Sequence, residues 1–224
     1  PRGGMRKGRT MRLYETYRPK TLEEVVGQED AKRQIEIALR SGWGGKAYWI
    51  SGASGTGKTT LARIIARMGA DDMYVEEFDS ADCLTVEAIH QIEEGMCFFG
   101  GGRGGRAYIV NEAHGLWCAI VRRLLGLLER LPSHCVFVFT TTGAGQKDLF
   151  GKQIDAGPLL SRCIPIELQT DGLEQKFARR CRQIAAAEGL DGRPERDYVE
   201  LAVQCKGNFR AMLQAVESGH MLHG

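Results

Sequence analysis

Short runs rich in apolar and β-branched residues alternate with longer segments of helical periodicity through most of the chain. Runs of this length, bounded by glycine or polar residues, predict buried strands. They lie at residues 47–50, 73–78, 107–110, 135–139 and 163–168. Helices are predicted between them, at residues 29–40, 61–66, 85–94 and 116–130. This alternation predicts an α/β fold with a mostly parallel five-stranded sheet that helices cover on both faces.

The pattern changes after Leu168, where only helical periodicity continues. Three helices are predicted, at residues 173–188, 196–206 and 208–217, and glycines separate them. A domain boundary is therefore expected near Thr170. The chain is predicted to divide into a flexible, basic, Gly-rich arm at residues 1–13, a sheet domain at 14–169 and a small all-helical domain at 170–224.

A phosphate-binding loop follows the first predicted strand and opens the next helix. Its residues are Gly52, Ala53, Ser54, Gly55, Thr56, Gly57, Lys58 and Thr59. The glycines let backbone N–H groups wrap phosphates without a clashing Cβ, and the helix N-terminus adds a favourable dipole. Lys58 can neutralise the β- and γ-phosphates, and the Thr59 hydroxyl can ligate Mg²⁺. This P-loop predicts ATP and Mg²⁺ as ligands.

The third predicted strand ends in a short polar segment, Asn111-Glu112-Ala113-His114. At this position one carboxylate would serve in the Mg²⁺ shell, and the next would polarise the attacking water. Glu112 can act as that base. Asn111 offers an amide oxygen to the metal shell but no charge. The segment therefore predicts hydrolysis that is slow but real.

The bulk composition is that of an ordinary globular protein, with 224 residues and a formal net charge of +2. No apolar run approaches the roughly 20 residues of a membrane-spanning helix. The basic N-terminus lacks the apolar centre of a secretory signal. These features predict a cytoplasmic protein. The net charge is too small to indicate a nucleic-acid binder by itself.

Seven cysteines are scattered singly along the chain. None forms a C-x-x-C pair, which argues against zinc sites of the usual spacing, and the odd number argues against a complete disulfide framework. Most are expected to be buried thiols that behave as small apolar residues.

Several further segments follow one another in a distinctive order. They are Tyr17-Arg18-Pro19 at the start of residues 17–28, Asp79-Ser80-Ala81-Asp82, the Asn111 segment, residues 128–132 followed by Thr140-Thr141-Thr142, Leu160-Ser161-Arg162-Cys163 and Gly207-Asn208-Phe209-Arg210. In this order they resemble the AAA+ clamp-loader ATPases, namely the small subunits of replication factor C and the motor subunit of the bacterial DNA polymerase III clamp loader. The resemblance covers roughly residues 14–218.

The resemblance implies an AAA+ P-loop NTPase fold in which the helical domain forms a lid. Beyond the P-loop itself, it implies nucleotide contacts from Arg18, Pro19, Val26, Thr60, Asn111 and Arg210. Lys58, Glu112 and Thr142 would act in catalysis within one subunit, with Thr59 and Asn111 facing the metal. Arg162 would reach the nucleotide of a neighbouring subunit and stabilise transition-state charge there.

The same resemblance implies partners. ATP would hold other clamp-loader subunits together in a ring or spiral, which would load a sliding clamp onto primer–template DNA. Arg122 and Arg123 match an arginine pair that lies toward the inside of the replication factor C ring. A contact with the DNA backbone needs no more than such charge and reach. No membrane partner is expected.

Three features depart from the family pattern. Asn111 replaces an aspartate, and residues 143–158 form a longer stretch than usual. The family's C-terminal helical collar is also expected to be missing: either it was removed, or the chain is a compact relative with other assembly contacts. The bacterial motor subunit's zinc-binding insert is also missing, which favours the resemblance to replication factor C. Two other functions stay open: an AAA+ DNA motor for branch migration or fork maintenance, and a subunit that binds ATP as a structural switch with little turnover.

Overall fold

The computed structural model describes residues 12–142 and 157–222, and its contacts divide the chain into two compact units. One unit is Lys20–Gln169. The other combines the described residues before Lys20 with those from Thr170 onward. Residues 14–19, which the sequence places with the sheet, are thus grouped with the C-terminal helices. The division into separate domains stays a prediction.

The first unit is built on a five-stranded sheet in the order β2-β3-β4-β1-β5. The strands are β1 (Lys46–Gly52), β2 (Val75–Phe78), β3 (Arg106–Val110), β4 (Cys135–Thr141) and β5 (Cys163–Leu168). Every neighbouring pair is parallel. The predicted α/β class and five-stranded parallel sheet are therefore confirmed. The strand expected at residues 73–78 begins later, because Asp72–Tyr74 forms a 3-10 turn (η1) before β2.

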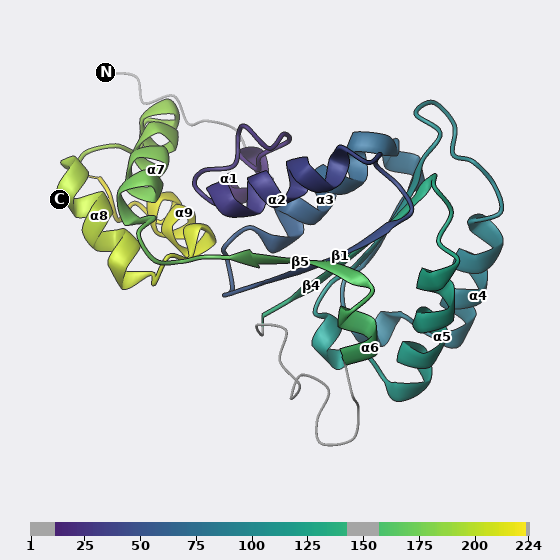
Figure 1. Cartoon of the computed structure of the whole chain (residues 1–224). Helices are drawn as coiled ribbons and strands as arrows, with labels where there is room; N and C mark the ends of the chain where they lie inside the picture. The colour runs from purple at the N-terminus through teal and green to yellow at the C-terminus, as the bar shows by residue number, and fades with distance from the viewer. Residues whose placement is uncertain (1–11, 143–156, 223–224) are drawn as a thin grey trace. The chain divides into compact units, whose positions relative to one another are not determined.

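Helices cover both faces of this sheet, as Figure 1 shows. One face carries α2 (Glu29–Leu39) and α3 (Lys58–Gly69). The other carries α4 (Val86–Gly95), α5 (Cys118–Glu129) and α6 (Gly157–Leu160). Short 3-10 turns, η2 (Ala81–Cys83) and η3 (Ala113–Gly115), come after β2 and β3.

The alternation of side chains along β4 divides the core between these faces. Val136 and Val138 pack in the cluster with α2 and α3, whereas Phe137 and Phe139 pack in the cluster with α4 and α5. All of β4 is buried. A central strand with both faces covered is expected to be apolar throughout, and β4 is apolar until Thr140.

Strand β5 lies at one edge of the sheet and contacts only β1 among the described strands. Pro165 is exposed in the middle of β5, paired in register with Trp49. Proline has no N–H to donate, so it is tolerated in an edge strand. At the end of β5, Leu168 lies opposite Gly52, the last residue of β1.

The second unit is helical among its described residues: α1 (Leu13–Thr16), α7 (Glu174–Glu188), α8 (Glu195–Gln204) and α9 (Phe209–Glu217). The N-terminal segment is anchored to the later helices. The backbone N–H of Leu13 donates to Glu217 Oε1 at 2.6 Å, and the Tyr17 hydroxyl donates to Glu188 Oε1 at 2.6 Å. Leu13 is buried, although the sequence places it in a flexible arm; residues 1–11 of that arm lie outside the described residues.

All seven cysteines are free thiols. Cys135, Cys163 and Cys181 are buried, Cys205 is half-buried, and the other three are exposed. The expectation that most are buried is thus wrong, because the exposed three lie in turns and at a helix start on the surface. Burial raises the pKa of the Cys163 thiol to about 12. Within the described ranges, no helix has the length and apolar character to cross a membrane.

Candidate nucleotide-binding site

The P-loop connects β1 to α3 and needs glycine for two separate reasons. A Cβ at Gly52 would lie 2.9 Å from both the Cβ and the carbonyl oxygen of Leu168 in β5, closer than real Cβ contacts. Gly57 has φ 104°, a left-handed conformation that a side chain would strain, directly before α3. The loop therefore takes the tight turn that exposes backbone N–H groups to a phosphate.

Lys58 begins α3 and is folded over this loop. Its side chain is buried, with 7% of the residue exposed, and its Nζ donates to the carbonyl oxygens of Gly52 at 2.9 Å and Ala53 at 2.8 Å. The Thr56 hydroxyl also donates to Ala53 at 2.8 Å. A cation is thus held within the loop at the N-terminus of α3, where the helix dipole also favours an anion.

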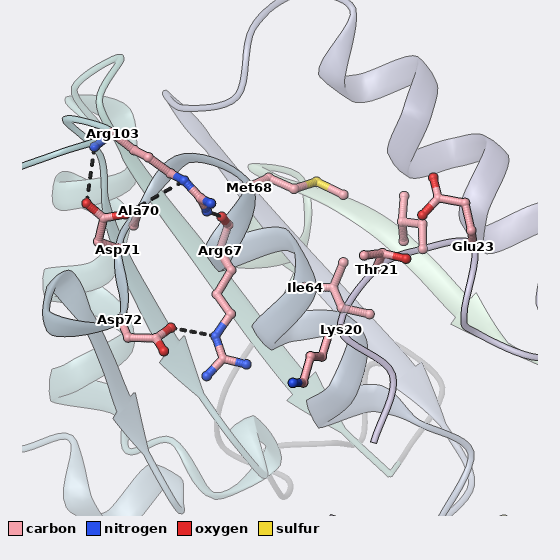
Figure 2. A pocket seen from close by; sticks show the side chains of 11 residues that line it. Lys20, Thr21, Glu23, Ile64, Arg67, Met68, Ala70, Asp71, Asp72 and Arg103 are labelled. Atoms are coloured by element: carbon pink, nitrogen blue, oxygen red, sulfur yellow. Dashed lines mark hydrogen bonds and ion pairs between the residues drawn. The ribbon is translucent and has the colours of Figure 1, made fainter. Parts of the chain in front are cut away.

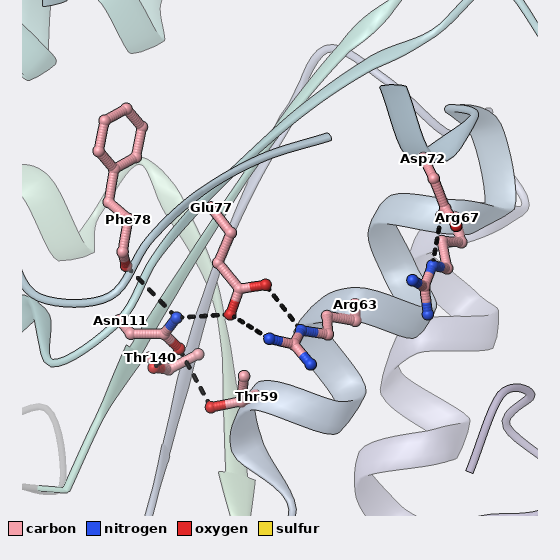
Figure 3. Close-up of polar contacts among 8 residues, drawn as sticks. All are labelled: Thr59, Arg63, Arg67, Asp72, Glu77, Phe78, Asn111 and Thr140. Carbon is pink, nitrogen blue, oxygen red and sulfur yellow. Dashed lines mark hydrogen bonds and ion pairs between the residues drawn. The ribbon is translucent and has the colours of Figure 1, made fainter. Parts of the chain in front are cut away.

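Asn111 lies at the centre of a hydrogen-bonded group that links three strand ends to α3 (Figure 3). Its Oδ1 accepts from the Thr59 hydroxyl at 3.1 Å and from the Thr140 hydroxyl at 2.9 Å. Its Nδ2 donates to Glu77 Oε1 at 2.9 Å and to the Phe78 carbonyl at 3.3 Å. An amide oxygen accepts two hydrogen bonds and an amide NH₂ donates two, so the buried side chain is fully satisfied.

Arg63 connects Glu77 back to the P-loop helix. Its Nε donates to Glu77 Oε2 at 2.6 Å and its Nη2 donates to Oε1 at 3.0 Å, a bidentate pair. Arg63 lies one turn after Thr59 on α3, so one helix face supplies both the hydroxyl and the guanidinium. No sequence motif singles out Glu77 or Arg63.

Thr140, rather than the predicted Thr142, reaches this group. The β3–β4 register pairs Val110 with Phe139, and the next residues along each strand are therefore neighbours: Asn111 and Thr140. Thr142 lies beyond the end of β4 and is exposed. The parallel register could have identified Thr140 once the pairing of the two strands was known. A catalytic role for Thr142 stays a prediction.

Glu112 comes directly after Asn111 in a left-handed conformation with φ 50° and ψ 46°. Its side chain is 45% exposed, and Oε2 lies 3.4 Å from Nδ1 of His114. The same His114 nitrogen lies 3.4 Å from the Thr141 hydroxyl. The Glu112 carboxylate is therefore accessible to water, whereas the neighbouring Asn111 is buried.

The other predicted residues are more widely distributed. Val26 precedes α2 and Thr60 lies on α3, both half-buried, whereas Arg122 and Arg123 are exposed on α5. Arg162 is exposed before β5; its Nη1 donates to the Pro158 carbonyl at 2.8 Å and its Nη2 to Glu129 of α5. Arg18, Pro19 and Arg210 belong to the helical unit, where the Arg210 guanidinium lies 5.3 Å from the centre of the Tyr14 ring.

A hollow of about 920 Å³ also lies on the first unit (Figure 2). It is lined by residues 20–23, by the second half of α3, by residues 70–72 and by Arg103, and no residue of the P-loop lines it. Its arginines are paired: Arg67 Nε lies 2.6 Å from Asp72 Oδ1, and Arg103 Nε lies 3.7 Å from Asp71 Oδ1. This hollow is therefore separate from the phosphate-binding loop.

A P-loop between the first strand and its helix, in a parallel sheet of order β2-β3-β4-β1-β5, defines a P-loop NTPase of the AAA+ class. The chain is moreover homologous to the gamma and tau subunits of bacterial DNA polymerase III. It is 31% identical to DNA polymerase III subunit tau of Bacillus subtilis over 200 residues, covering 80% of this chain and 34% of that protein. For DNA polymerase III subunit tau of Escherichia coli the identity is 27% over 233 residues, covering 92% and 35%.

Two further comparisons agree with this class. The family model for magnesium chelatase subunit ChlI matches residues 21–97. The solved structure of the RuvB Holliday junction branch migration motor of Thermotoga maritima superposes with a TM-score of 0.69 at 22% identity, covering 90% of this chain and 64% of that one. The RuvB likeness shows the fold alone. The predicted resemblance to the bacterial DNA polymerase III subunit is confirmed, and the chain spans about a third of the length of the two tau relatives.

Proposed function

We propose that this chain binds and hydrolyses Mg²⁺–ATP as a clamp-loader subunit in DNA replication. The observation that carries the proposal is the junction of the P-loop with β3: Lys58 is held within the loop, and the Thr59 hydroxyl meets Asn111 Oδ1 at 3.1 Å. The homology to DNA polymerase III gamma and tau subunits supports the setting in replication.

The donor set fits Mg²⁺ carried by a nucleotide. Mg²⁺ prefers oxygen ligands, keeps several waters, and is commonly bound through few protein groups together with substrate phosphates. The Thr59 hydroxyl and the Asn111 carbonyl oxygen, with Thr140 behind them, are such oxygens. Thr59 would hold the ion through the lone pairs of its hydroxyl oxygen, and Asn111 Oδ1 would accept from a metal-bound water once one of the two hydroxyls that now donate to it rotates. When bound, Mg²⁺ would neutralise charge that develops on the phosphates.

The remaining groups have separate roles in hydrolysis. The backbone of the loop and Lys58 bind and orient the β- and γ-phosphates. Glu112, with its accessible carboxylate, accepts the proton of the attacking water, and His114 at 3.4 Å restrains that carboxylate. Thr142 would orient the attacking water or the γ-phosphate. The resemblance to clamp-loader ATPases further implies nucleotide contacts from Arg18, Pro19 and Arg210. Val26 and Thr60 contribute from the first unit.

Assembly would complete the site. Arg162 is exposed and would leave Glu129 to reach the nucleotide of a neighbouring subunit. A positive charge at that point stabilises the transition state. ATP would thereby hold a ring or spiral of subunits around primer–template DNA and a sliding clamp. The exposed arginines of α5, Arg122 and Arg123, would contact the DNA backbone.

The first test measures ATP hydrolysis in the presence of primed DNA, candidate clamps and partner subunits. Lys58→Ala is expected to abolish nucleotide binding, and Arg162→Ala to leave binding intact while removing the stimulated hydrolysis. Arg193→Ala, an exposed arginine of the helical unit, is the control. Stimulated hydrolysis that survives Arg162→Ala would show that this arginine does not act in trans. Stimulation by junction DNA without any clamp would indicate a branch-migration or fork-maintenance motor instead.

A second candidate function rests on Asn111. A subunit that lacks the carboxylate in the metal shell could bind ATP as a structural switch and turn it over little. The protein would then show ATP-dependent assembly, measured by molar mass in solution, without DNA-stimulated hydrolysis. A gain of hydrolysis in Asn111→Asp under those conditions would support the switch, whereas no gain would show that the amide is harmless.

A further inference from the structure

The Asn111 side chain is chemically asymmetric, and its two ends face different surroundings. The oxygen faces two hydroxyl groups, those of Thr59 and Thr140. The nitrogen faces two acceptors, the carboxylate of Glu77 and the carbonyl of Phe78 (Figure 3). In this orientation an oxygen, and not an NH₂ group, points toward the P-loop threonine.

The hydroxyl groups do not decide this orientation. A threonine hydroxyl can rotate and either donate or accept, so Thr59 and Thr140 would accommodate both ends of the amide. An ionised carboxylate and a carbonyl can only accept. Reversing the Asn111 amide would bring its oxygen against Glu77 and Phe78, and neither would then receive a hydrogen bond from this side chain.

Glu77 is the stronger of these two constraints. Its hydrogen bond from Asn111 is 2.9 Å long, compared with 3.3 Å for the Phe78 carbonyl, and an ionised acceptor makes the stronger bond. Arg63 holds Glu77 in place with two hydrogen bonds, at 2.6 and 3.0 Å. The side chain of Glu77 is 19% exposed, so its rotamer is restricted by packing as well.

We propose that Glu77, fixed by Arg63, is a positioning residue of the nucleotide site: it holds the Asn111 amide with its oxygen toward Thr59 and the metal. This inference rests on the proposed binding of Mg²⁺–ATP and deepens it. An aspartate at position 111 would need no such orientation, since both oxygens of a carboxylate are acceptors. An amide has only one acceptor oxygen, so a neighbouring residue has to fix which way it faces. A reversed amide would instead direct an NH₂ group at a cation.

The test measures the affinity of a fluorescent ATP analogue twice for each variant of the full chain, once with Mg²⁺ and once with EDTA. The ratio of the two dissociation constants reports the gain from Mg²⁺. Glu77→Gln keeps the size of the side chain and frees the amide to reverse. Substituting a residue that orients a metal ligand typically costs about 10–100-fold in metal affinity, so we expect this ratio to fall by about tenfold or more.

A second background separates positioning from a general effect of charge. In Asn111→Asp no amide remains to be oriented, and the new carboxylate would face the carboxylate of Glu77. Adding Glu77→Gln in that background is therefore expected to leave the Mg²⁺ ratio unchanged or to raise it. Glu77→Gln should therefore lower the Mg²⁺ ratio when residue 111 is Asn but not when it is Asp. A role of Glu77 in folding alone would not produce this dependence on residue 111.

Asp72→Asn is the matched control, because it breaks an exposed arginine pair one turn further along α3. Its Mg²⁺ ratio is expected to equal that of the wild type. The inference is overturned if Glu77→Gln weakens binding equally with and without Mg²⁺, leaves both affinities unchanged, or has the same effect in the Asn111→Asp background. A wild-type chain that binds no nucleotide would overturn the proposed function as well, so the two failures are distinguishable.

Discussion

Two arginines one turn apart on α3 form ion pairs of the same kind with very different surroundings (Figure 3). Arg63 and Glu77 have side chains that are 34% and 19% exposed, and two hydrogen bonds join them. Arg67 and Asp72 are 45% and 74% exposed, and one hydrogen bond of 2.6 Å joins them. The inner pair continues to Asn111, whereas the outer pair borders the hollow on the surface.

Surroundings decide what each of these ion pairs contributes. An exposed pair gains about 0–1 kcal/mol, because water screens the attraction and two long side chains lose freedom. The inner pair is less screened, and its carboxylate accepts from a third residue. Beyond any stabilisation of the fold, the inner pair orients Asn111, because Glu77 accepts a hydrogen bond from the Asn111 amide nitrogen.

The largest expected effect comes from removing the inner arginine. Arg63→Leu leaves the Glu77 carboxylate without a cation, and the free energy of unfolding should fall by about 2 kcal/mol, less than for a fully buried pair. Urea denaturation measures this loss. Arg67→Leu serves as the comparison and should cost under about 0.5 kcal/mol, the usual range for surface changes. Equal losses from the two substitutions would contradict the distinction between the pairs.

A smaller effect is expected where the inner group meets β4. Thr140→Val removes a donor to the buried Asn111 oxygen, which should lower the free energy of unfolding by about 1–2 kcal/mol. The matched change Thr142→Val, beyond the end of the strand, should have almost no effect on stability. Thermal or urea unfolding of both variants checks the pair of values. A greater loss in Thr142→Val would mean that the wrong threonine has been placed in the group.

The coupling free energies of the two ion pairs should depend differently on salt concentration. A double-mutant cycle on Arg67 and Asp72 is expected to give a coupling free energy of about 0.3 kcal/mol at low salt. That coupling should vanish near 1 M NaCl, where the Debye length is about 3 Å. The coupling between Arg63 and Glu77 should keep most of its value. If both couplings declined in parallel, the inner pair would be as solvated as the outer one.

A similarly small effect is predicted for Asp72→Asn alone. This residue is the most exposed member of the two pairs, so the free energy of unfolding should stay within about 0.5 kcal/mol of the wild type. Affinity for the ATP analogue should not change. Equilibrium unfolding and a nucleotide titration check the two statements, and a clear loss of nucleotide affinity would connect the outer pair to the site after all.

Much of the fold could be predicted from the alternation of strands and helices. Each of the five predicted strands exists, and the P-loop lies between a strand and a helix as the motif requires. The limits of elements were less predictable. Met73 and Tyr74 belong to the apolar run in the sequence, but they lie in a 3-10 turn, and β2 pairs with β3 only from Val75 onward.

The candidate site was predictable where one segment of chain carries it. Asn111 and Lys58 were evident from local motifs. In the structure Lys58 contacts the P-loop carbonyls, and Thr59, the next residue, donates to Asn111. Glu77 and Thr140 were not evident, because their contacts depend on which strands are neighbours. Parallel pairing of β2, β3 and β4 places the ends of these strands side by side, and periodicity within a single strand carries no information about that order.

Strand β5 also bears on self-association. It is an edge strand, and an exposed edge offers unpaired backbone groups to any other extended chain. Pro165, in the middle of its six residues, removes one of the donors that an added strand would need. Copies of this unit are therefore discouraged from joining sheet to sheet at that edge.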